Sequence, residues 1–370
     1  MRADASDFMG SGHIMRCLTL AEALAKKNVQ TTFICRDWPG HMQEQIEARG
    51  FPVVLLPSLP LQAKQQIELS DDTTWLGCDF DTDAQQTINA LKTMYSEHAC
   101  VDLLVVDHYG IDIRWESLLQ KYYRQLFVID DLANKSHICD VLLDQTFQRQ
   151  SNDYHELVPK DSRILCGTKY ALLKETFTQL PVNVINIDTT STVEPLRIFI
   201  FLGGSDPLNK TAEAITAITA ITSIDDTNAG IHIDLVLGAQ NKHADAISKI
   251  IKNSLLKIQV YRNVENMAEL MSHSDIAIGA AGTSSWERCC LGLPSLVFVY
   301  ADNQSMISEQ LLQANAVKIW KTAEELNQQV QLLLNDASLR KEMSLAAKKV
   351  CDGKGTERVV NALLSLITFK

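Results

Sequence analysis

The chain alternates between segments typical of β-strands and segments typical of α-helices along almost its whole length. Short runs rich in Val, Ile, Leu and Phe are followed by longer segments in which apolar residues recur every three or four positions. This pattern predicts strands at residues 31–35, 52–56, 103–107, 126–129, 141–144, 197–202, 232–237, 258–261, 275–278, 295–299 and 317–320. Strands that are joined through helices run parallel, so the chain is predicted to be an α/β protein.

The best candidate for a linker lies between residues 179 and 195, where Asn and Thr are frequent and no period is evident. We predict a linker there (residues 179–195), between an N-terminal α/β domain (residues 1–178) and a C-terminal α/β domain (residues 196–370) with a helix-rich tail. A chain of 370 residues is long for one hydrophobic core, which supports the division. Each half carries a glycine-rich turn after its first strand, so we expect two Rossmann-like domains facing each other across a cleft. Only residues 2–5 are left for the first strand, which is expected to be short unless the start codon is placed late.

The first glycine-rich turn carries a candidate general base. Gly10 and Gly12 bracket Ser11, and His13 stands where the following helix begins. Small residues let the backbone approach a ligand, and a helix N-terminus offers unpaired N–H groups to an anion. The helix dipole disfavours a protonated imidazole at this end, which favours a neutral, base-competent His13. A tight turn with a partly buried histidine would give the same pattern, so the motif alone leaves both interpretations open.

Two turns in the second half have the composition of a phosphate site. Gly203, Gly204 and Ser205 follow the predicted strand 197–202, where bare backbone amides can face a diphosphate. A double glycine after a strand is also a common turn.

The second of these turns precedes a predicted helix. Ser284 and Ser285 stand at the start of that helix and could share its N–H groups with a phosphate. Glu287 lies in the first turn, where its carboxylate could accept hydrogen bonds from ribose hydroxyls. The alternative interpretation is an ordinary helix cap with a first-turn glutamate.

Polar residues also follow two predicted strands of the first half. Asp107, His108 and Tyr109 come directly after strand 103–107, and Asp131 follows strand 126–129. Ligands of parallel sheets bind beyond the carboxyl ends of the strands, so these residues are candidates for sugar contacts or for orienting a base. Aspartates at strand ends also cap helices. Two sheet edges of this kind would suit a substrate with two ends, such as a nucleotide-sugar.

The composition excludes several classes of function. The formal charge is −11, from 34 basic and 45 acidic side chains, and an acidic surface repels nucleic acid and anionic lipid. The chain has nine cysteines and no C-x-x-C pair, which predicts reduced thiols. It has no apolar run close to the roughly 20 residues that span a bilayer. We therefore expect a soluble cytoplasmic protein.

Missing motifs narrow the choice further. The chain has no G-x-x-x-x-G-K-[ST] loop, so ATP or GTP hydrolysis is not expected. Met15 occupies the third glycine position of G-x-G-x-x-G, which disfavours a nicotinamide-dependent dehydrogenase. No metal site and no cofactor are predicted.

Several motifs, taken together in order and spacing, resemble those of one enzyme family. They are RADAS at residues 2–6, GSGH at 10–13, MRCLTLA at 15–21, VDHYG at 106–110, CDVLLDQ at 139–145, CGTKYALL at 166–173, GGSD at 203–206 and GTSSWE at 282–287. This set is similar to that of the UDP-2,4-diacetamido-2,4,6-trideoxy-β-L-altropyranose hydrolases of the pseudaminic acid pathway. That family has the two-domain GT-B fold and resembles the UDP-GlcNAc transferase that makes lipid II.

The resemblance implies hydrolysis of the UDP-sugar by water attack at the anomeric carbon, with C–O cleavage and inversion. It implies that His13 is the catalytic base, that Gly203, Gly204 and Ser205 approach the diphosphate or uridine, that Ser284 and Ser285 contact the phosphates, and that Glu287 contacts the ribose. Two alternatives remain: a GT-B glycosyltransferase with a UDP-sugar donor, and a nucleotide-sugar-binding protein without catalysis. The only partners expected are the UDP-sugar and water, and the expected state is a monomer.

Overall fold

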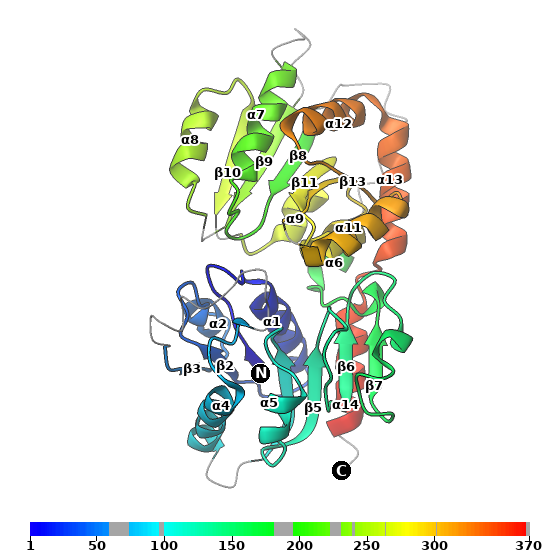
Figure 1. Cartoon of the computed structure of the whole chain (residues 1–370). Helices are drawn as coiled ribbons and strands as arrows, with labels where there is room; N and C mark the ends of the chain where they lie inside the picture. Colours follow the sequence, from blue (N-terminus) through cyan, green and yellow to red (C-terminus); the bar gives the residue numbers. More distant parts are fainter. Residues whose placement is uncertain are drawn as a thin grey trace. The chain divides into compact units, whose positions relative to one another are not determined.

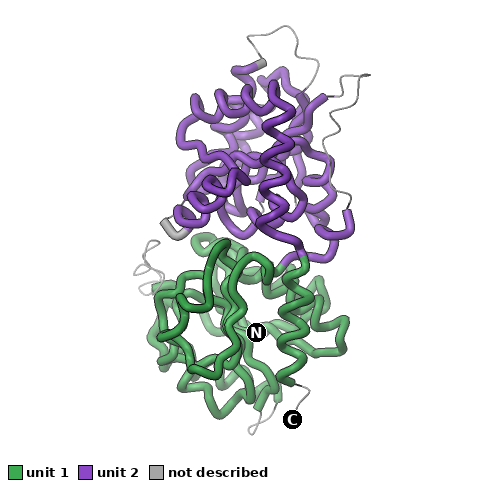
Figure 2. Tube along the Cα trace, turned by 90° about the vertical axis from the view of Figure 1, so that its right-hand side faces the viewer, with its two compact units in different colours: residues 1–172, 354–370 green, residues 173–353 purple. Residues whose placement is uncertain are grey.

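The computed structural model describes residues 1–58, 74–95, 100–180, 195–222, 231–238, 241–262, 264–300 and 302–367. The chain forms two compact units, which Figure 2 distinguishes by colour. The first unit contains Met1–Leu172 together with Lys354–Lys370, and the second contains Leu173–Gly353. Most of the predicted linker, residues 181–194, lies outside the described residues.

The first unit is built on a seven-stranded sheet in the order β3-β2-β1-β4-β5-β6-β7, in which all strand pairs are parallel. Its elements are β1 (Arg2–Ala3), α1 (Gly12–Ala25), β2 (Phe33–Arg36), α2 (Gln43–Glu47), β3 (Val53–Leu56), α4 (Phe80–Tyr95), β4 (Val101–Asp107), α5 (Ile113–Leu118), β5 (Tyr123–Ile129), β6 (Val141–Asp144), β7 (Arg163–Cys166) and α14 (Gly355–Ile367), with 3₁₀ turns at Ser151–Tyr154 and Thr168–Tyr170. Strand β1 has only two residues, in agreement with the prediction of a short first strand.

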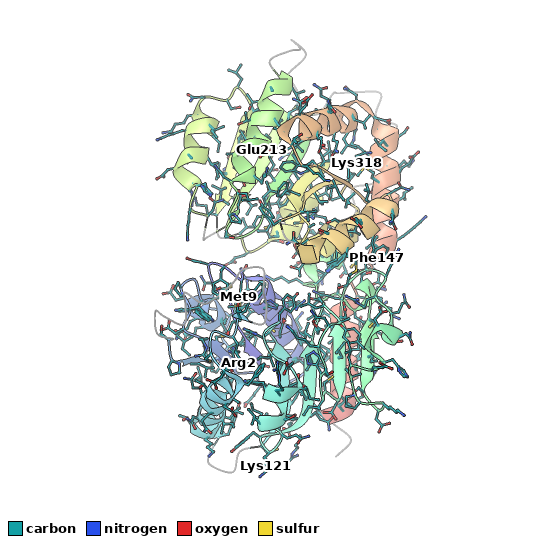
Figure 3. The ribbon with its side chains drawn as sticks, viewed as in Figure 1. Arg2, Met9, Lys121, Phe147, Glu213 and Lys318 are labelled. Carbon is teal, nitrogen blue, oxygen red and sulfur yellow. The ribbon has the colours of Figure 1, made fainter. Side chains whose placement is uncertain are left out.

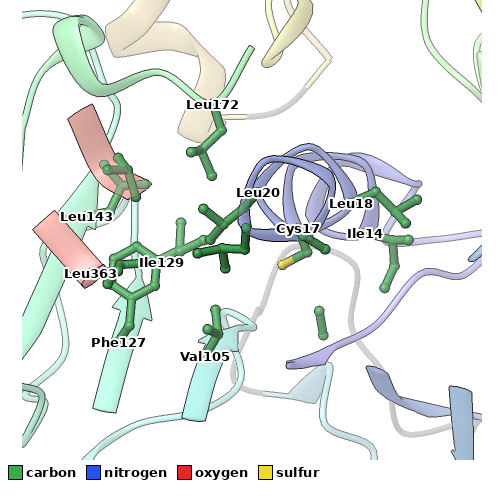
Figure 4. Packing of buried hydrophobic residues seen from close by; sticks show 14 of the residues in the cluster. Ile14, Cys17, Leu18, Leu20, Val105, Phe127, Ile129, Leu143, Leu172 and Leu363 are labelled. Carbon is green, nitrogen blue, oxygen red and sulfur yellow. The ribbon is translucent and has the colours of Figure 1, made fainter. Parts of the chain in front are cut away.

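Alternate residues of these strands face two separate hydrophobic cores. On one face, Val105, Phe127 and Ile129 pack with Leu18 of α1 and Leu363 of α14 (Figure 4). On the other face, the intervening residues of β4 and β5 pack against helices α4 and α5. Because side chains of a strand alternate between the faces of a sheet, helices on both sides require strands that are apolar throughout.

Helix α14 differs from its predicted place. The tail was expected to belong to the second domain, but Val359, Val360 and Leu363 are buried in the core of the first unit. The helix approaches this unit closely at Gly355, where a Cβ atom would lie 2.2 Å from the carbonyl oxygen of Ala171. The apolar face of such a helix is visible in the sequence, whereas the sheet that it covers is not.

The second unit has a six-stranded parallel sheet in the order β10-β9-β8-β11-β12-β13. Its elements are α6 (Thr176–Gln179), β8 (Leu196–Phe201), α7 (Lys210–Thr222), β9 (Ile231–Leu237), α8 (Ala244–Lys252), β10 (Lys257–Arg262), α9 (Met267–Ser272), β11 (Ile276–Ala280), α10 (Ser284–Leu291), β12 (Ser295–Phe298), α11 (Asp302–Gln313), β13 (Val317–Ile319), α12 (Ala323–Asn335) and α13 (Ala337–Val350). Helices α7, α8 and α12 share one core with β8. Helix α10 packs beside α9 and α13, both of which Figure 1 labels.

In each sheet there is one point at which the order of the strands reverses. Strand β1 lies between β2 and β4, and β8 lies between β9 and β11. The connections from β1 and from β4 therefore run to opposite sides, as do those from β8 and β11, and open parallel sheets bind ligands beyond the carboxyl ends at such points. In the first unit, Met9 and Phe147 follow carboxyl ends and lie at one end of the sheet, whereas Lys121 precedes β5 and lies at the other (Figure 3).

A fully buried network of charges connects β1 to its neighbours. Arg2 donates to both carboxylate oxygens of Asp4, and its Nη2 lies 2.9 Å from Asp83 of α4. Arg36 of β2 also binds Asp83, and Trp115 donates its indole N–H to the same carboxylate at 2.9 Å. Buried charges are stable only when they are paired and hydrogen-bonded, so Asp83 is central to the packing of the short strand β1.

None of the described helices has the length and apolar character that a bilayer crossing requires.

Candidate active site

His13 and Asp107 meet at the point between β1 and β4, although 94 residues separate them. His13 lies in the first turn of α1, and its Nδ1 is 2.6 Å from Oδ1 of Asp107. Burial alone would raise the pKa of Asp107, but Arg16 and His13 hold that pKa well below its usual range. A carboxylate can only accept, so Nδ1 carries the proton, and in the neutral imidazole this tautomer leaves the lone pair on Nε2. Within the described part of the chain, no group forms a hydrogen bond with Nε2.

Arg16 holds this pair in place and is a residue to which the sequence reasoning assigned no role. Its Nε and Nη2 donate to the two oxygens of Asp107 at 2.6 and 2.7 Å, and its Nη1 binds Asp131. Residues three apart lie on the same face of a helix, so the spacing of His13 and Arg16 was the signal that could have identified it.

Tyr109 and Asp131 complete the cluster. The Tyr109 hydroxyl donates to Oδ2 of Asp131 at 2.9 Å, and its ring lies edge-on to His13 with 4.5 Å between the ring centroids. Oδ1 of Asp131 is buried and has no hydrogen-bond partner among the described residues. This oxygen is therefore an acceptor that a ligand or a water molecule can use.

His108 is not part of this cluster, although it follows Asp107 directly. Its Nδ1 accepts a hydrogen bond from the backbone N–H of Gly110 at 3.0 Å, and its Nε2 lies 3.3 Å from Asp4. Burial lowers the pKa of His108, and its side chain is 1% exposed. The structure places His108 against the buried charges of β1, where it has a packing role.

The turn before α1 is held by its own backbone. Gly10 has a φ of +76°, and its N–H donates to the carbonyl of Ser6 at 2.9 Å. Ser11 is the N-cap residue but its side chain makes no capping bond, and Gly12 begins the helix. The first intrahelical bond runs from the N–H of Met15 to Ser11, so the earlier N–H groups of α1 are not used within the helix.

In the second unit, the turn after β8 is fixed from several sides. Gly203 has a φ of +97°. The backbone of Gly204 lies against Gly238, where an added Cβ atom would be 2.0 Å from the carbonyl oxygen of Gly204. Asp206, one residue after Ser205, accepts hydrogen bonds from the first N–H groups of α7 and from Tyr300. A turn without side chains is thus held at the carboxyl end of β8, beside β11.

Helix α10 brings two hydroxyls of its first turn together with two charged groups, Glu287 of the same turn and Arg288 of the last turn. Arg288 donates to the hydroxyl oxygens of Ser284 and Ser285, each at 3.0 Å. Burial raises the pKa of Glu287 to about 7, and the positive charges of Arg288 and Lys174 oppose that shift only in part. Since α10 follows β11, these groups lie at the point where the strand order of the second sheet reverses, as Gly203 and Gly204 do.

Comparisons with known proteins identify relatives of both units. Residues 197–359 match the C-terminal domain of glycosyltransferase family 28. The chain is 27% identical over 305 residues to the UDP-2,4-diacetamido-2,4,6-trideoxy-β-L-altropyranose hydrolase of Campylobacter jejuni. The aligned region covers 82% of this chain and 92% of that protein. It is 23% identical to the spore coat polysaccharide biosynthesis protein SpsG of Bacillus subtilis, over 98% and 97% of the two chains.

A third relative is longer. The chain is 24% identical to an uncharacterized protein of Methanocaldococcus jannaschii over 80% of its own residues, and it spans about half, 54%, of that protein's length.

Solved structures show the same fold at low identity. Acinetobacter baumannii MurG matches with a TM-score of 0.64 and 16% identity over 99% of both chains. A UDP-N-acetylglucosamine 2-epimerase matches with a TM-score of 0.63 and 14% identity, over 100% of this chain and 96% of that one. The chain thus has the predicted GT-B fold with two parallel-sheet α/β domains, and it is a distant homologue of the C. jejuni hydrolase and of glycosyltransferase family 28 enzymes.

Proposed function

We propose that this protein is an enzyme that hydrolyses UDP-2,4-diacetamido-2,4,6-trideoxy-β-L-altropyranose to UDP and the free sugar, a step of pseudaminic acid biosynthesis. The observation that carries the proposal is His13, whose Nδ1 is bound to Asp107 while Nε2 has no partner in the described part of the chain. The homology to the C. jejuni hydrolase, over most of both chains, supports this choice of substrate.

In this proposal His13 activates water. Nε2 accepts a proton from the water molecule as its oxygen attacks the anomeric carbon, and the sugar–oxygen bond to UDP breaks on the opposite side, which inverts that carbon. Asp107 keeps Nδ1 protonated and stabilises the imidazolium that forms.

The second unit supplies the groups for the leaving nucleotide. Diphosphate is a good leaving group, so stabilisation of its developing charge matters more than a strong acid. The N–H groups of α10, the hydroxyls of Ser284 and Ser285, and the bare turn at Gly203 provide donors for phosphate oxygens. Glu287 accepts hydrogen bonds from the ribose hydroxyls.

A glycosyltransferase is the second candidate, and the match of residues 197–359 to glycosyltransferase family 28 favours it. His13 would then deprotonate an acceptor hydroxyl instead of water, with the same groups at the nucleotide. The two reactions differ only in the molecule that attacks the anomeric carbon.

Hydrolysis in ¹⁸O-labelled water separates these candidates. With the UDP-sugar and EDTA present, we expect UDP release without any acceptor and one ¹⁸O atom in the sugar product. Release that begins only when an acceptor is added would favour the transferase, and ¹⁸O in UDP would contradict cleavage of the C–O bond. Mass spectrometry of both products reads out each case.

The binding of uridine is expected to weaken about tenfold between pH 8 and pH 6. Glu287 must be ionised to accept from both ribose hydroxyls, and burial raises its pKa to about 7, so lowering the pH protonates it and removes an acceptor. Uridine carries no phosphate that titrates in this range. Calorimetry with the native protein and with Glu287→Gln measures the effect, and the variant should bind weakly with no change in this range. An equal pH dependence in both proteins would assign the titration to another group.

A further inference from the structure

Arg288 is a buried cation without a carboxylate partner in the described part of the chain. The residue is 1% exposed, and its guanidinium donates to the carbonyl of Ala280 at 2.8 Å and to the hydroxyls of Ser284 and Ser285. Nε of Arg288 is buried and has no hydrogen-bond partner among the described residues. The adjacent Glu287 interacts with this charge electrostatically, but among the described residues its carboxylate forms no salt bridge with the guanidinium. An unpaired buried charge is costly, so such a group requires a reason beyond packing.

The shape of the sheet makes room for this guanidinium. A Cβ on Gly279 of β11 would lie 2.6 Å from Nη1 of Arg288, so a larger residue at position 279 would collide with it. Arg288 therefore reaches across the carboxyl end of β11 and lies under the first turn of α10. Its positive charge adds to the positive end of that helix.

The direction of the hydrogen bonds determines what the two serines can offer. A hydroxyl has one proton and two lone pairs, and a guanidinium can only donate. Because Arg288 donates to the oxygens of both Ser284 and Ser285, each O–H is left to donate elsewhere. Donors of this kind, beside a buried positive charge that has no salt bridge in the described part of the chain, suit an anion with several acceptor oxygens.

We propose that Arg288 is a positioning residue for the diphosphate of the nucleotide-sugar. It fixes both serine hydroxyls with their protons directed at the phosphates, and the diphosphate supplies the negative charge that the buried guanidinium lacks. The inference rests on the proposed function, since it concerns the nucleotide site assigned there.

The test compares UDP with uridine, which lacks phosphates. Arg288→Met removes the charge and keeps an unbranched side chain of similar length. Because the Arg288 charge opposes the rise in the pKa of Glu287, the comparison is made at about pH 8.5, well above the Glu287 pKa of about 7. We expect the variant to bind UDP about 10- to 100-fold more weakly, while uridine affinity changes less than about twofold. Arg288→Lys keeps the charge but not the planar fork, and should lie between the native protein and Arg288→Met. Calorimetry gives both affinities, and the melting temperature of each variant reports folding.

A double-mutant cycle tests whether Arg288 acts through the hydroxyls. The double variant Ser284→Ala/Ser285→Ala should also weaken UDP binding but not uridine binding. Adding Arg288→Met to it should then reduce UDP affinity by a smaller factor than Arg288→Met does in the native protein. If Arg288→Met does not fold, Arg288→Lys and the serine variants carry the test, because both keep a cation in place. A parallel loss of UDP and uridine affinity, or no loss, would overturn the inference. A native protein that binds neither ligand would instead overturn the proposed function.

Discussion

Replacing His13 by Ala is expected to slow the release of UDP from the UDP-sugar by about 100- to 10,000-fold, the usual contribution of a positioned general base. In the native protein Asp107 fixes the tautomer of His13 with its Nε2 lone pair available, and alanine leaves no group there to take the proton from water. A coupled assay of UDP formation at pH 7.5, with native protein and variant at equal concentration, measures the loss.

Two controls separate this loss from a general defect. UDP binding to His13→Ala should match that of the native protein, because the proposed nucleotide residues all belong to the second unit. His273→Ala removes an exposed histidine at the end of α9 and should retain full activity. Undiminished UDP release by His13→Ala would reject His13 as the base, and UDP release lost together with UDP binding would point to a structural defect.

Much of the fold was predictable because the strand signal is local. Residues 141–144 were predicted as a strand and form β6, and most other predicted strands differ from the observed ones by one to three residues at an end. Strand β7, Arg163–Cys166, was not predicted, since four residues with a charged first position show no clear period. The side of the molecule that α14 covers could not be predicted, because an amphipathic helix reveals its apolar face and not its partner.

The sequence indicated which residues of the candidate site follow strands, but not which of them are in contact. The sequence places His13, Asp107 and Tyr109 after strands, and parallel topology brings strand ends to one edge. That Asp107 contacts His13 depends on β1 lying beside β4, an order that no local pattern sets. Neighbouring residues of an extended chain point in opposite directions, so Asp107 joins the cluster while His108 turns to the charges of β1.

Replacing Asp83 by Ala is expected to lower the free energy of unfolding of the first unit by about 3–5 kcal/mol. The change leaves Arg36 without its carboxylate, takes one of two carboxylates from Arg2, and removes the acceptor of the Trp115 indole. All of these groups are buried, so water cannot replace the lost partner. Urea unfolding followed by tryptophan fluorescence and circular dichroism measures the change, with the transitions of the two units fitted separately because a two-unit chain need not unfold in one step.

Asp81→Ala is the matched control, because Asp81 lies in the same first turn of α4 but is exposed. Both substitutions remove one carboxylate from the positive end of the helix, so their shared effect on the helix dipole cancels in the comparison. Asp81→Ala should lower the free energy of unfolding by less than about 1 kcal/mol. If the two variants are equally stable, the buried network contributes no more than a surface charge, and the short strand β1 must be held by its apolar contacts alone. A much larger loss for Asp83→Ala would instead mean that paired charges in the core fix β1, and with β1 the turn that carries His13.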